Sequence, residues 1–373
     1  MNIKSLKLRN FRNYKQLDLE FAPHINILVG NNAQGKTNIL EAIYLLAAAK
    51  SFRASKESEM IKHNEISSLI SGKIQRDAVH KLEITISNIA VKSIKCNTKE
   101  TQQKEFVGNF NVVLFSPEDL SLIKGSPGQR RRFMDLEISQ VNAGYRSLLA
   151  DYQKILVHRN SLLKDIAHKN KYEKMLEVWD EQLIEVGTRL MVQRAEMIYK
   201  LGLLSRLIHR KLSNNQEELI LRYSPFYAEN NEQLDYDYQT IKSRFSYALA
   251  EEKPFELLRG YSLVGPQRDD FIFLINQLDA KRYASQGQQR TAVLSCRLAE
   301  LEYMKSETGR YPVILLDDVM SELDELRKKY LLKLLDKKVQ TIITTTDISD
   351  FEPELLQNAS VFFVESGQVT ERR

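Results

Sequence analysis

The residues best suited to chemistry lie between positions 30 and 37, where Lys36 and Thr37 end the spacing Gly-x-x-x-x-Gly-Lys-Thr. An apolar segment, residues 25–29, precedes this loop, and apolar residues at helical spacing follow it, as a phosphate-binding loop requires. In such a loop the backbone N–H groups face a phosphate, the lysine adds a positive charge and the hydroxyl is placed to ligate Mg²⁺. The sequence therefore predicts a site for a nucleotide and Mg²⁺. The predicted nucleotide-binding residues are Gly30, Asn31, Asn32, Ala33, Gln34, Gly35, Lys36, Thr37 and Asn38.

Two adjacent carboxylates, Asp317 and Asp318, follow a second apolar segment at residues 312–316. In proteins that hydrolyse nucleoside triphosphates, the first carboxylate after such a strand holds Mg²⁺ through water, and the second can orient the attacking water. The alternative is a β-turn that carries two acids. Beside a phosphate-binding loop we expect the first arrangement, with Thr37 and Asp317 on the metal and with Lys36, Asp317 and Asp318 in catalysis.

A second candidate for phosphate contact is Ser285, which lies with Gly287 in the segment Ala-Ser-Gln-Gly-Gln-Gln-Arg, residues 284–290. Apolar residues at helical spacing follow, so a hydroxyl and several amides lie at a helix N-terminus, where an anion is favoured. Serine and glutamine at such positions are also common capping residues. The residues alone leave both roles open.

Three consecutive arginines, Arg130, Arg131 and Arg132, follow a turn that contains proline and glycine. This positive cluster is suited to DNA phosphates, but carboxylates of a neighbouring segment would pair with it equally well. The formal net charge of +5 is too small to decide between the two. We take the three arginines as candidate DNA-binding residues.

The composition is that of a globular protein rather than a disordered one. Of its residues, 43% are apolar and 28% are charged, as in ordinary globular proteins. A length of 373 residues is enough for two or three domains. The two cysteines, Cys96 and Cys296, are far apart and lack the spacing of a zinc site or a disulfide framework. The N-terminus has no apolar signal core and no run approaches the length of a membrane span. We expect a soluble, cytoplasmic protein.

The elements that must position these residues begin with strands. Alternating apolar residues predict strands at residues 3–8, 17–21 and 82–86, and short buried strands are expected at residues 111–115 and 340–343. A polar, basic connection is expected from residue 50 onward, and residues 340–343 are expected to form the last apolar strand.

The middle of the chain has helical periodicity. We expect one long helix over residues 136–166 and a second over residues 172–212, which turn back on each other at residues 167–171. Trp179 is expected in the core between them. A shorter helix, residues 241–250, is expected to be ended by Pro254.

Taken in order, these pieces resemble the ABC-type ATPase heads of the SMC and repair proteins, and over nearly the full length they resemble the RecF family. The residues that carry the resemblance are 8–14 (Leu-Arg-Asn-Phe-Arg-Asn-Tyr), 30–42, 115–120 (Phe-Ser-Pro-Glu-Asp-Leu), 130–133, 265–270 (Gly-Pro-Gln-Arg-Asp-Asp), 284–290 and 315–318. The resemblance implies an α/β fold, an ABC-type P-loop head with mixed sheets around the P-loop helix, plus an α-helical second lobe. Residues 1–120 and 310–373 would form the ATP-binding lobe, and residues 121–309 the lobe with the signature motif.

The resemblance also implies a mechanism. In such heads, residues corresponding to Ser285 and Gly287 of one subunit cover the γ-phosphate held by the P-loop of another, so ATP joins a homodimer and hydrolysis releases it. RecF-like heads bind DNA at gaps and at junctions of single and double strands, and they act with RecR and RecO in loading recombinase. Arg9 and Arg12 match a segment near the nucleotide base.

The resemblance implies a DNA-stimulated ATPase, and two departures from other ABC heads suggest that its hydrolysis is slow. Asp318 lies where most heads carry glutamate, and Thr346 or Asp347 lies where many carry a histidine. The alternatives are a P-loop kinase that uses the middle helices as a substrate lobe, and a scaffold that binds ATP and DNA with negligible turnover.

Overall fold

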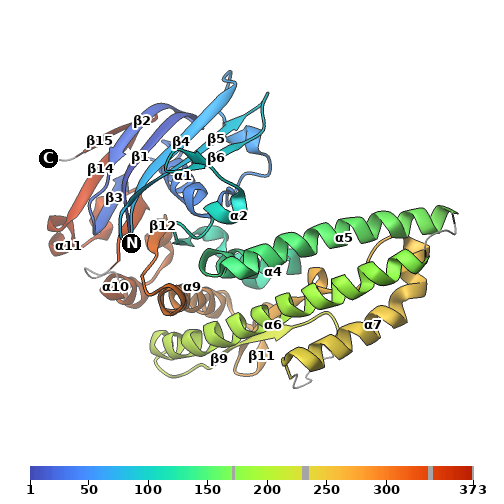
Figure 1. Cartoon of the computed structure of the whole chain (residues 1–373). Coiled ribbons are helices and arrows are strands. Elements are labelled where there is room, and N and C mark those ends of the chain that lie inside the picture. The colour runs from blue at the N-terminus through green and yellow to red at the C-terminus, as the bar shows by residue number, and fades with distance from the viewer. Residues whose placement is uncertain (170–172, 229–234, 335–338, 372–373) are drawn as a thin grey trace. The chain divides into compact units, whose positions relative to one another are not determined.

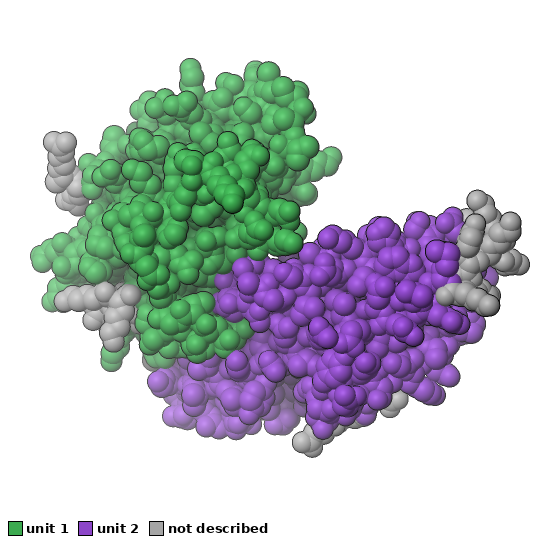
Figure 2. Space-filling model, in the orientation of Figure 1, with its two compact units in different colours: residues 1–119, 300–373 green, residues 120–299 purple. Residues whose placement is uncertain are grey.

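The computed structural model describes residues 1–169, 173–228, 235–334 and 339–371, which fall into two compact units. Unit 1 comprises residues 1–119 and 300–373, and unit 2 comprises residues 120–299 (Figure 2). The assignment of ATP binding and of the signature motif to the predicted lobes remains a prediction. The turn expected at residues 167–171 extends into residues 170–172, which lie outside the described ranges.

Unit 1 contains an antiparallel sheet with the strand order β2-β1-β4-β5-β6-β7. Its strands are β1 (Asn2–Phe11), β2 (Tyr14–Glu20), β4 (Ser67–Gln75), β5 (Val79–Ser87), β6 (Ser93–Cys96) and β7 (Lys99–Glu100). Strands β1, β2 and β5 confirm the predictions from alternation. Strand β4 lies where only a polar connection was expected, so that expectation was wrong. Its serines hide the pattern, yet Ile70 and Ile74 are fully buried.

The second sheet of unit 1 has the order β15-β14-β3-β13-β12-β8. Its strands are β3 (Ile25–Val29), β8 (Val112–Phe115), β12 (Val313–Asp317), β13 (Thr341–Thr345), β14 (Ala359–Glu365) and β15 (Gln368–Glu371). Strand β15 is antiparallel to β14, and the other neighbours are parallel. Strands β3, β12 and β13 are buried along their whole length, as central strands of a parallel sheet are. The expectation that residues 340–343 form the last strand was wrong, because β14 and β15 follow.

Helix α1 (Lys36–Ala48) starts at the phosphate-binding loop and contacts strands of both sheets, β4 and β5 on one side and β8, β12 and β13 on the other. It is buried almost all round, which fits a helix with sheets on both sides. Mixed sheets around the P-loop helix are therefore confirmed. The remaining short elements of this part of the chain are η1 (Glu57–Met60), α2 (Gln103–Phe106), η2 (Pro117–Leu120), η4 (Val319–Glu322), α10 (Glu325–Leu334), η5 (Ile348–Asp350) and α11 (Pro353–Gln357).

Unit 2 is mainly helical, with long helices α5, α6 and α7 packed side by side (Figure 1). Its helices are α3 (Ser121–Lys124), α4 (Pro127–Val141), α5 (Ala143–Lys169), α6 (Glu173–Leu212), α7 (Tyr238–Arg259), η3 (Pro266–Arg268), α8 (Ala280–Tyr283) and α9 (Gln286–Thr308), the last of which ends in unit 1. A small antiparallel sheet has the order β11-β10-β9, formed by β9 (Leu219–Ser224), β10 (Asp270–Ile275) and β11 (Leu278–Asp279). Among the described residues, no helix is long and apolar enough to cross a membrane.

Two helix predictions in unit 2 were wrong in detail. Residues 136–166 do not form one helix, because Asn142 is extended (φ −125°, ψ 107°) and separates α4 from α5. Its side-chain oxygen accepts a 3.0 Å hydrogen bond from the Tyr145 N–H and so starts α5. Pro254 lies inside α7 instead of ending it. Pro254 and Ala250, whose carbonyl loses its N–H partner, are both exposed, so water can satisfy that carbonyl.

Trp179 is not a core residue, contrary to expectation. It is only half-buried and stacks on the ring of His158, with the ring centroids 5.2 Å apart.

Candidate nucleotide site

The phosphate-binding loop connects the end of β3 to the start of α1. A side chain is excluded at each of its two glycines, for a different steric reason at each. A Cβ on Gly30 would lie 2.2 Å from the carbonyl oxygen of Val364, so only glycine lets β14 pass this close to the end of β3. Gly35 has φ +119°, and a Cβ there would lie 2.6 Å from Nδ2 of Asn13. Both glycines are therefore required by the fold as well as by a bound phosphate.

Neighbouring segments brace the loop through its carbonyl groups. Asn13 donates a 2.9 Å hydrogen bond to the carbonyl of Gln34, the Gly367 N–H donates to the same carbonyl at 3.2 Å, and the Tyr14 hydroxyl donates to the carbonyl of Gly35 at 3.2 Å. In contrast, the N–H groups of residues 35–37 have no acceptor within the described part of the chain. Fixed carbonyls and available N–H groups at a helix N-terminus are the arrangement that binds phosphate.

Lys36 is folded back onto this loop. Its ammonium donates to the carbonyl of Gly30 at 2.5 Å and to that of Asn31 at 2.9 Å, and the residue is only 6% exposed. Burial lowers the pKa of Lys36, and the nearby Asp318 and Asp317 carboxylates oppose that shift. The Lys36 side chain is thus held in place before any ligand arrives. A bound phosphate would stabilise the charged ammonium, which burial disfavours.

The metal-binding residues expected from the sequence meet in the structure. The Thr37 hydroxyl donates to Oδ1 of Asp317 at 2.8 Å, and the Thr344 hydroxyl on β13 donates to the same oxygen at 2.9 Å. Asp317 is 7% exposed, so burial raises its pKa, while the two hydroxyl hydrogen bonds lower it. A hydroxyl and a carboxylate in contact at the end of a buried strand can share one Mg²⁺.

Asp318, the proposed second carboxylate, has an unusual backbone. Its φ of 53° and ψ of 26° are left-handed, and it precedes η4. Its N–H donates a 2.9 Å hydrogen bond to the Thr344 hydroxyl, so Thr344 contacts both the carboxylate of Asp317 and the backbone of Asp318. A non-glycine residue in this region is uncommon and is frequently found where a side chain is aimed at a functional site.

Arg12 has a partner that the sequence did not reveal. Its guanidinium donates to both oxygens of Glu41 on α1, at 2.8 and 2.7 Å, and the Ser51 hydroxyl donates to the same carboxylate at 2.5 Å. Arg53, in the polar, basic connection expected from residue 50 onward, lies 3.4 Å from Glu41 and donates to Asn38. Because Glu41 is fully buried, these arginines fix the first turns of the P-loop helix.

Ser285 and Gly287 belong to unit 2 and lie exposed at the start of α9. The Ser285 N–H donates to Oε1 of Gln288 at 2.8 Å, and the Gln288 N–H donates back to the Ser285 hydroxyl at 3.3 Å. This reciprocal pair is a capping box, so the capping role is observed. The structure brings together Lys36, Thr37 and Asp317, whereas phosphate contact by Ser285 and Gly287 remains a prediction.

The arginine cluster divides into residues with different roles. Arg130 is 5% exposed and donates from Nε and one terminal nitrogen to the Asp270 carboxylate, at 2.6 and 2.7 Å. Arg131 donates to the carbonyl of Asp269 at 2.7 Å. The contacts of Arg130 favour the structural alternative, because its guanidinium is buried. Arg131 is half-buried, so DNA contact stays a prediction for it. Arg132 is exposed, and DNA contact stays a prediction for it.

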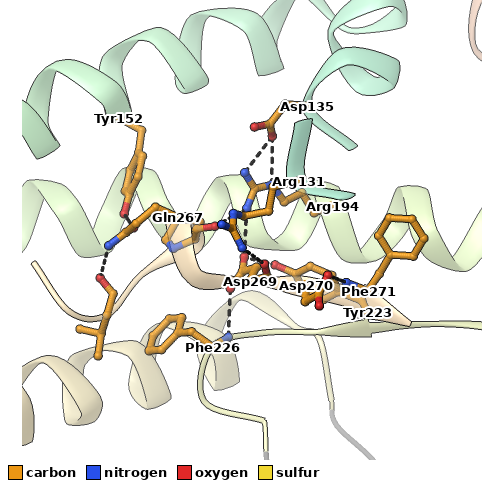
Figure 3. A network of polar contacts seen from close by, with 12 residues as sticks. Arg131, Asp135, Tyr152, Arg194, Tyr223, Phe226, Gln267, Asp269, Asp270 and Phe271 are labelled. Atoms are coloured by element: carbon orange, nitrogen blue, oxygen red, sulfur yellow. Dashed lines mark hydrogen bonds and ion pairs between the residues drawn. The ribbon is translucent and has the colours of Figure 1, made fainter. Parts of the chain in front are cut away.

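The segment 265–270, to which the sequence gave no chemical role, enters a buried polar network around Arg194 (Figure 3). Arg194 donates to Asp135 at 2.8 Å, to the carbonyl of Pro266 at 2.6 Å and to Asp269 at 3.1 Å, and the Tyr223 hydroxyl also donates to Asp269. Burial raises the pKa of Asp269, and Arg194 opposes that shift. The network joins α4, α6, β9 and η3, so this segment stabilises unit 2.

The fold and the P-loop geometry define a P-loop ATPase head of the type found in SMC proteins. The family model described as the RecF/RecN/SMC N terminal domain matches residues 2–370. The Smc head domain of Pyrococcus furiosus, at 17% identity and a TM-score of 0.54, covers 99% of this chain and 96% of its own, which supports the fold. The predicted fold class is confirmed.

Within that class, the chain belongs to the RecF family. It is 46% identical to a DNA replication and repair protein RecF of Alkaliphilus oremlandii, over 99% of this chain and 100% of that protein. The RecF of Halalkalibacterium halodurans is 42% identical, over 100% of both chains. A solved structure described as the recombination mediator protein RecF with ATP in the RecFOR pathway has a TM-score of 0.92 and 39% identity, covering 100% of this chain and 97% of that one.

Proposed function

We propose that this chain binds Mg-ATP at the P-loop and then dimerises, with Ser285 and Gly287 of each copy covering the phosphates held by the other. The dimer binds DNA at gaps and junctions in recombinational repair, acts with RecR and RecO, and is released by slow hydrolysis. The observation that carries the proposal is the contact of Thr37 with Asp317 at 2.8 Å beside the braced loop.

The residues of unit 1 fit Mg-ATP. Thr37 and Asp317 would hold Mg²⁺, and Lys36 with the N–H groups of residues 35–37 would hold the β- and γ-phosphates. Bound ATP supplies a phosphoanhydride whose cleavage makes release irreversible. Asp318, the residue after Asp317, would orient the attacking water.

Two features of the α9 tip support phosphate contact there. The Ser285 oxygen accepts the Gln288 N–H, but among the described residues its hydroxyl donates to no acceptor, so its proton is available to a phosphate oxygen. A Cβ on Gly287 would meet only the Ser285 hydroxyl oxygen, at 4.0 Å. Nothing in the described residues of its own chain requires glycine here, although glycine costs a helix about 0.5–1 kcal/mol. Close approach of a phosphate explains it.

The relatives support the DNA-repair part of the proposal. The curated relatives are described as DNA replication and repair proteins, and the solved RecF structures as a recombination mediator in the RecFOR pathway. The kinase alternative gains no support, because the RecF proteins match this chain over its full length.

Mixing two inactive variants tests the shared site. Lys36→Met removes the P-loop lysine, and Ser285→Arg blocks the α9 tip, so neither homodimer has an intact site. A mixed dimer has one intact site, made of the Ser285→Arg P-loop and the Lys36→Met tip. An equimolar mixture should therefore regain hydrolysis that neither variant has alone, up to about half of the wild-type rate, because each mixed dimer has one intact site of two.

The matched control is Ser161→Arg, the same change at an exposed position of α5, which should hydrolyse ATP as the wild type does. Failure of the mixture to regain activity, together with turnover by Ser285→Arg alone, would contradict the shared site. DNA-stimulated phosphate release, with Lys36→Met as the blank, separates a slow ATPase from a scaffold without turnover.

A further inference from the structure

We infer that buried His209 and half-buried Glu217 form an ion pair that positions the α9 tip through Gln288. His209 lies near the end of α6, and Glu217 lies between α6 and β9. The inference rests on the proposed role of Ser285, and it adds two positioning residues to that site.

Gln288 is the link between this pair and Ser285. Its Oε1 accepts the Ser285 N–H at 2.8 Å, and its Nε2 donates to Oε1 of Glu217 at 2.9 Å. The amide of Gln288 therefore has one end on the backbone of Ser285 and the other on a carboxylate. A change at Glu217 alters the orientation of Gln288 and, with it, the backbone of Ser285.

His209 fixes Glu217 from the other side. The imidazole is fully buried, its Nε2 lies 3.1 Å from Oε2 of Glu217, and its Nδ1 lies 3.2 Å from the Ser295 hydroxyl on α9. The next residue, Glu218, pairs instead with Arg206 and Arg210. His209 thus contacts α9 twice, directly at Ser295 and through Glu217 at the tip.

The hydrogen-bond directions assign the charge of His209. The Ser295 hydroxyl donates its single proton to the carbonyl of Thr291 at 2.7 Å, so its oxygen must accept from Nδ1 of His209. The Glu217 carboxylate can only accept, so Nε2 must donate as well. The proposal therefore takes His209 as an imidazolium, with a proton on each ring nitrogen, paired with Glu217.

A stability role alone does not explain this arrangement. Replacing a buried ion pair by apolar residues is often neutral or stabilising, whereas a satisfied polar network holds side chains in one arrangement. Within α9, the Thr291 hydroxyl also donates to the carbonyl of Gly287 at 2.8 Å. We assign this network to the geometry of the phosphate-contacting tip.

Three full-length variants test the assignment. Glu217→Leu removes the acceptor for Gln288 and leaves the imidazolium unpaired. Glu217→Gln can accept from Gln288 and donate to a neutral His209, so the chain of hydrogen bonds is kept. Glu218→Gln is the control, since Glu218 contacts arginines on α6 and no residue of the tip.

With ATP and Mg²⁺, Glu217→Leu should dimerise about tenfold more weakly, the scale of one lost hydrogen bond to a charged group. Glu217→Gln and Glu218→Gln should stay within about threefold of the wild type, and all three should bind ATP as monomers with unchanged affinity. Should Glu217→Leu fail to fold, Gln288→Met at the half-exposed position breaks the same link and should show the same loss.

Nitrogen NMR of His209 gives a readout that does not depend on dimerisation. The wild type should show an imidazolium, and Glu217→Gln should show a neutral ring protonated at Nδ1. A neutral His209 in the wild type, or a folded Gln288→Met variant that dimerises as the wild type does, would overturn the assignment. A wild type that does not dimerise with ATP would instead overturn the proposed function, and the NMR result would still stand.

Discussion

The Thr37 hydroxyl donates a 2.8 Å hydrogen bond to Asp317 across 280 residues of sequence. Thr344 donates to the same oxygen, Oδ1, and among the described residues Oδ2 accepts no hydrogen bond. One carboxylate oxygen therefore orients the side chain, and the other remains for a cation. This division of labour connects the fold of unit 1 to the proposed Mg²⁺ site.

Asp317→Asn should make the ligand-free protein more stable and less active. Burial raises the pKa of Asp317, so its negative charge lowers the stability of the folded state at neutral pH. This destabilisation is lost as the pH falls through the raised pKa and the carboxylate becomes protonated. The amide oxygen can still accept from Thr37 and Thr344. We expect a gain of about 1 kcal/mol at neutral pH, shrinking toward acid pH, with loss of Mg-dependent hydrolysis. Urea unfolding at several pH values checks this; lower stability of the variant at neutral pH would contradict it.

Asp318→Asn should uncouple dimerisation from hydrolysis. An amide cannot take a proton from the attacking water, so hydrolysis should fall by about a hundredfold or more. The Thr344 hydrogen bond is made by the Asp318 N–H and is kept, so ATP binding should survive and the dimer should persist. Phosphate release and dimer lifetime after ATP addition are the measurements. Equal loss of ATP binding and hydrolysis would assign Asp318 to the fold of the site instead.

Arg130→Ala should mainly lower stability, whereas Arg132→Ala should mainly weaken DNA binding. Arg130→Ala removes the guanidinium whose Nε lies 2.6 Å from Oδ1 of Asp270. The free energy of unfolding should therefore fall by about 3 kcal/mol. Removing exposed Arg132 should lower stability less than removing Arg130, and should lower the salt dependence of DNA binding by about one unit of slope. Thermal unfolding and salt titrations of DNA binding check both. An unchanged slope for Arg132→Ala would contradict the DNA contact predicted for Arg132.

Glu185 should contribute to acid sensitivity of the α6–α7 pair. Hydrogen bonds from Tyr238 and Lys242 lower its pKa from 4.5 to about 2. Its stabilising contribution is therefore present above pH 4.5 and is lost as the pH falls toward 2. Glu185→Gln should lower the melting temperature at pH 7 by less than about 2 °C, because the carboxylate is half-exposed and its ion pairs are screened by water. The difference from wild type should close in acid; a constant difference down to pH 2 would contradict it.

Local patterns predicted the loop and the elements around it, because Lys36, Thr37 and the glycines form one continuous motif and Asp317 ends an apolar strand. They did not predict β4, because its serines hide the two buried isoleucines. They also missed the break between α4 and α5, because one extended residue, Asn142, interrupts the helix while the helical spacing of apolar residues continues. Contacts between residues distant in the chain could not be predicted either. Glu41 with Arg12, and Glu217 with Gln288, are separated by 29 and 71 residues and have no local signature.

The most direct test of the account is the mass of the protein in solution, measured by light scattering with and without ATP and Mg²⁺. The account predicts a single protomer of 43.3 kDa without nucleotide and a species of about twice that mass with it. Ser285→Arg should stay at the protomer mass while still binding ATP. A wild type that binds Mg-ATP and remains a single protomer would contradict the shared site.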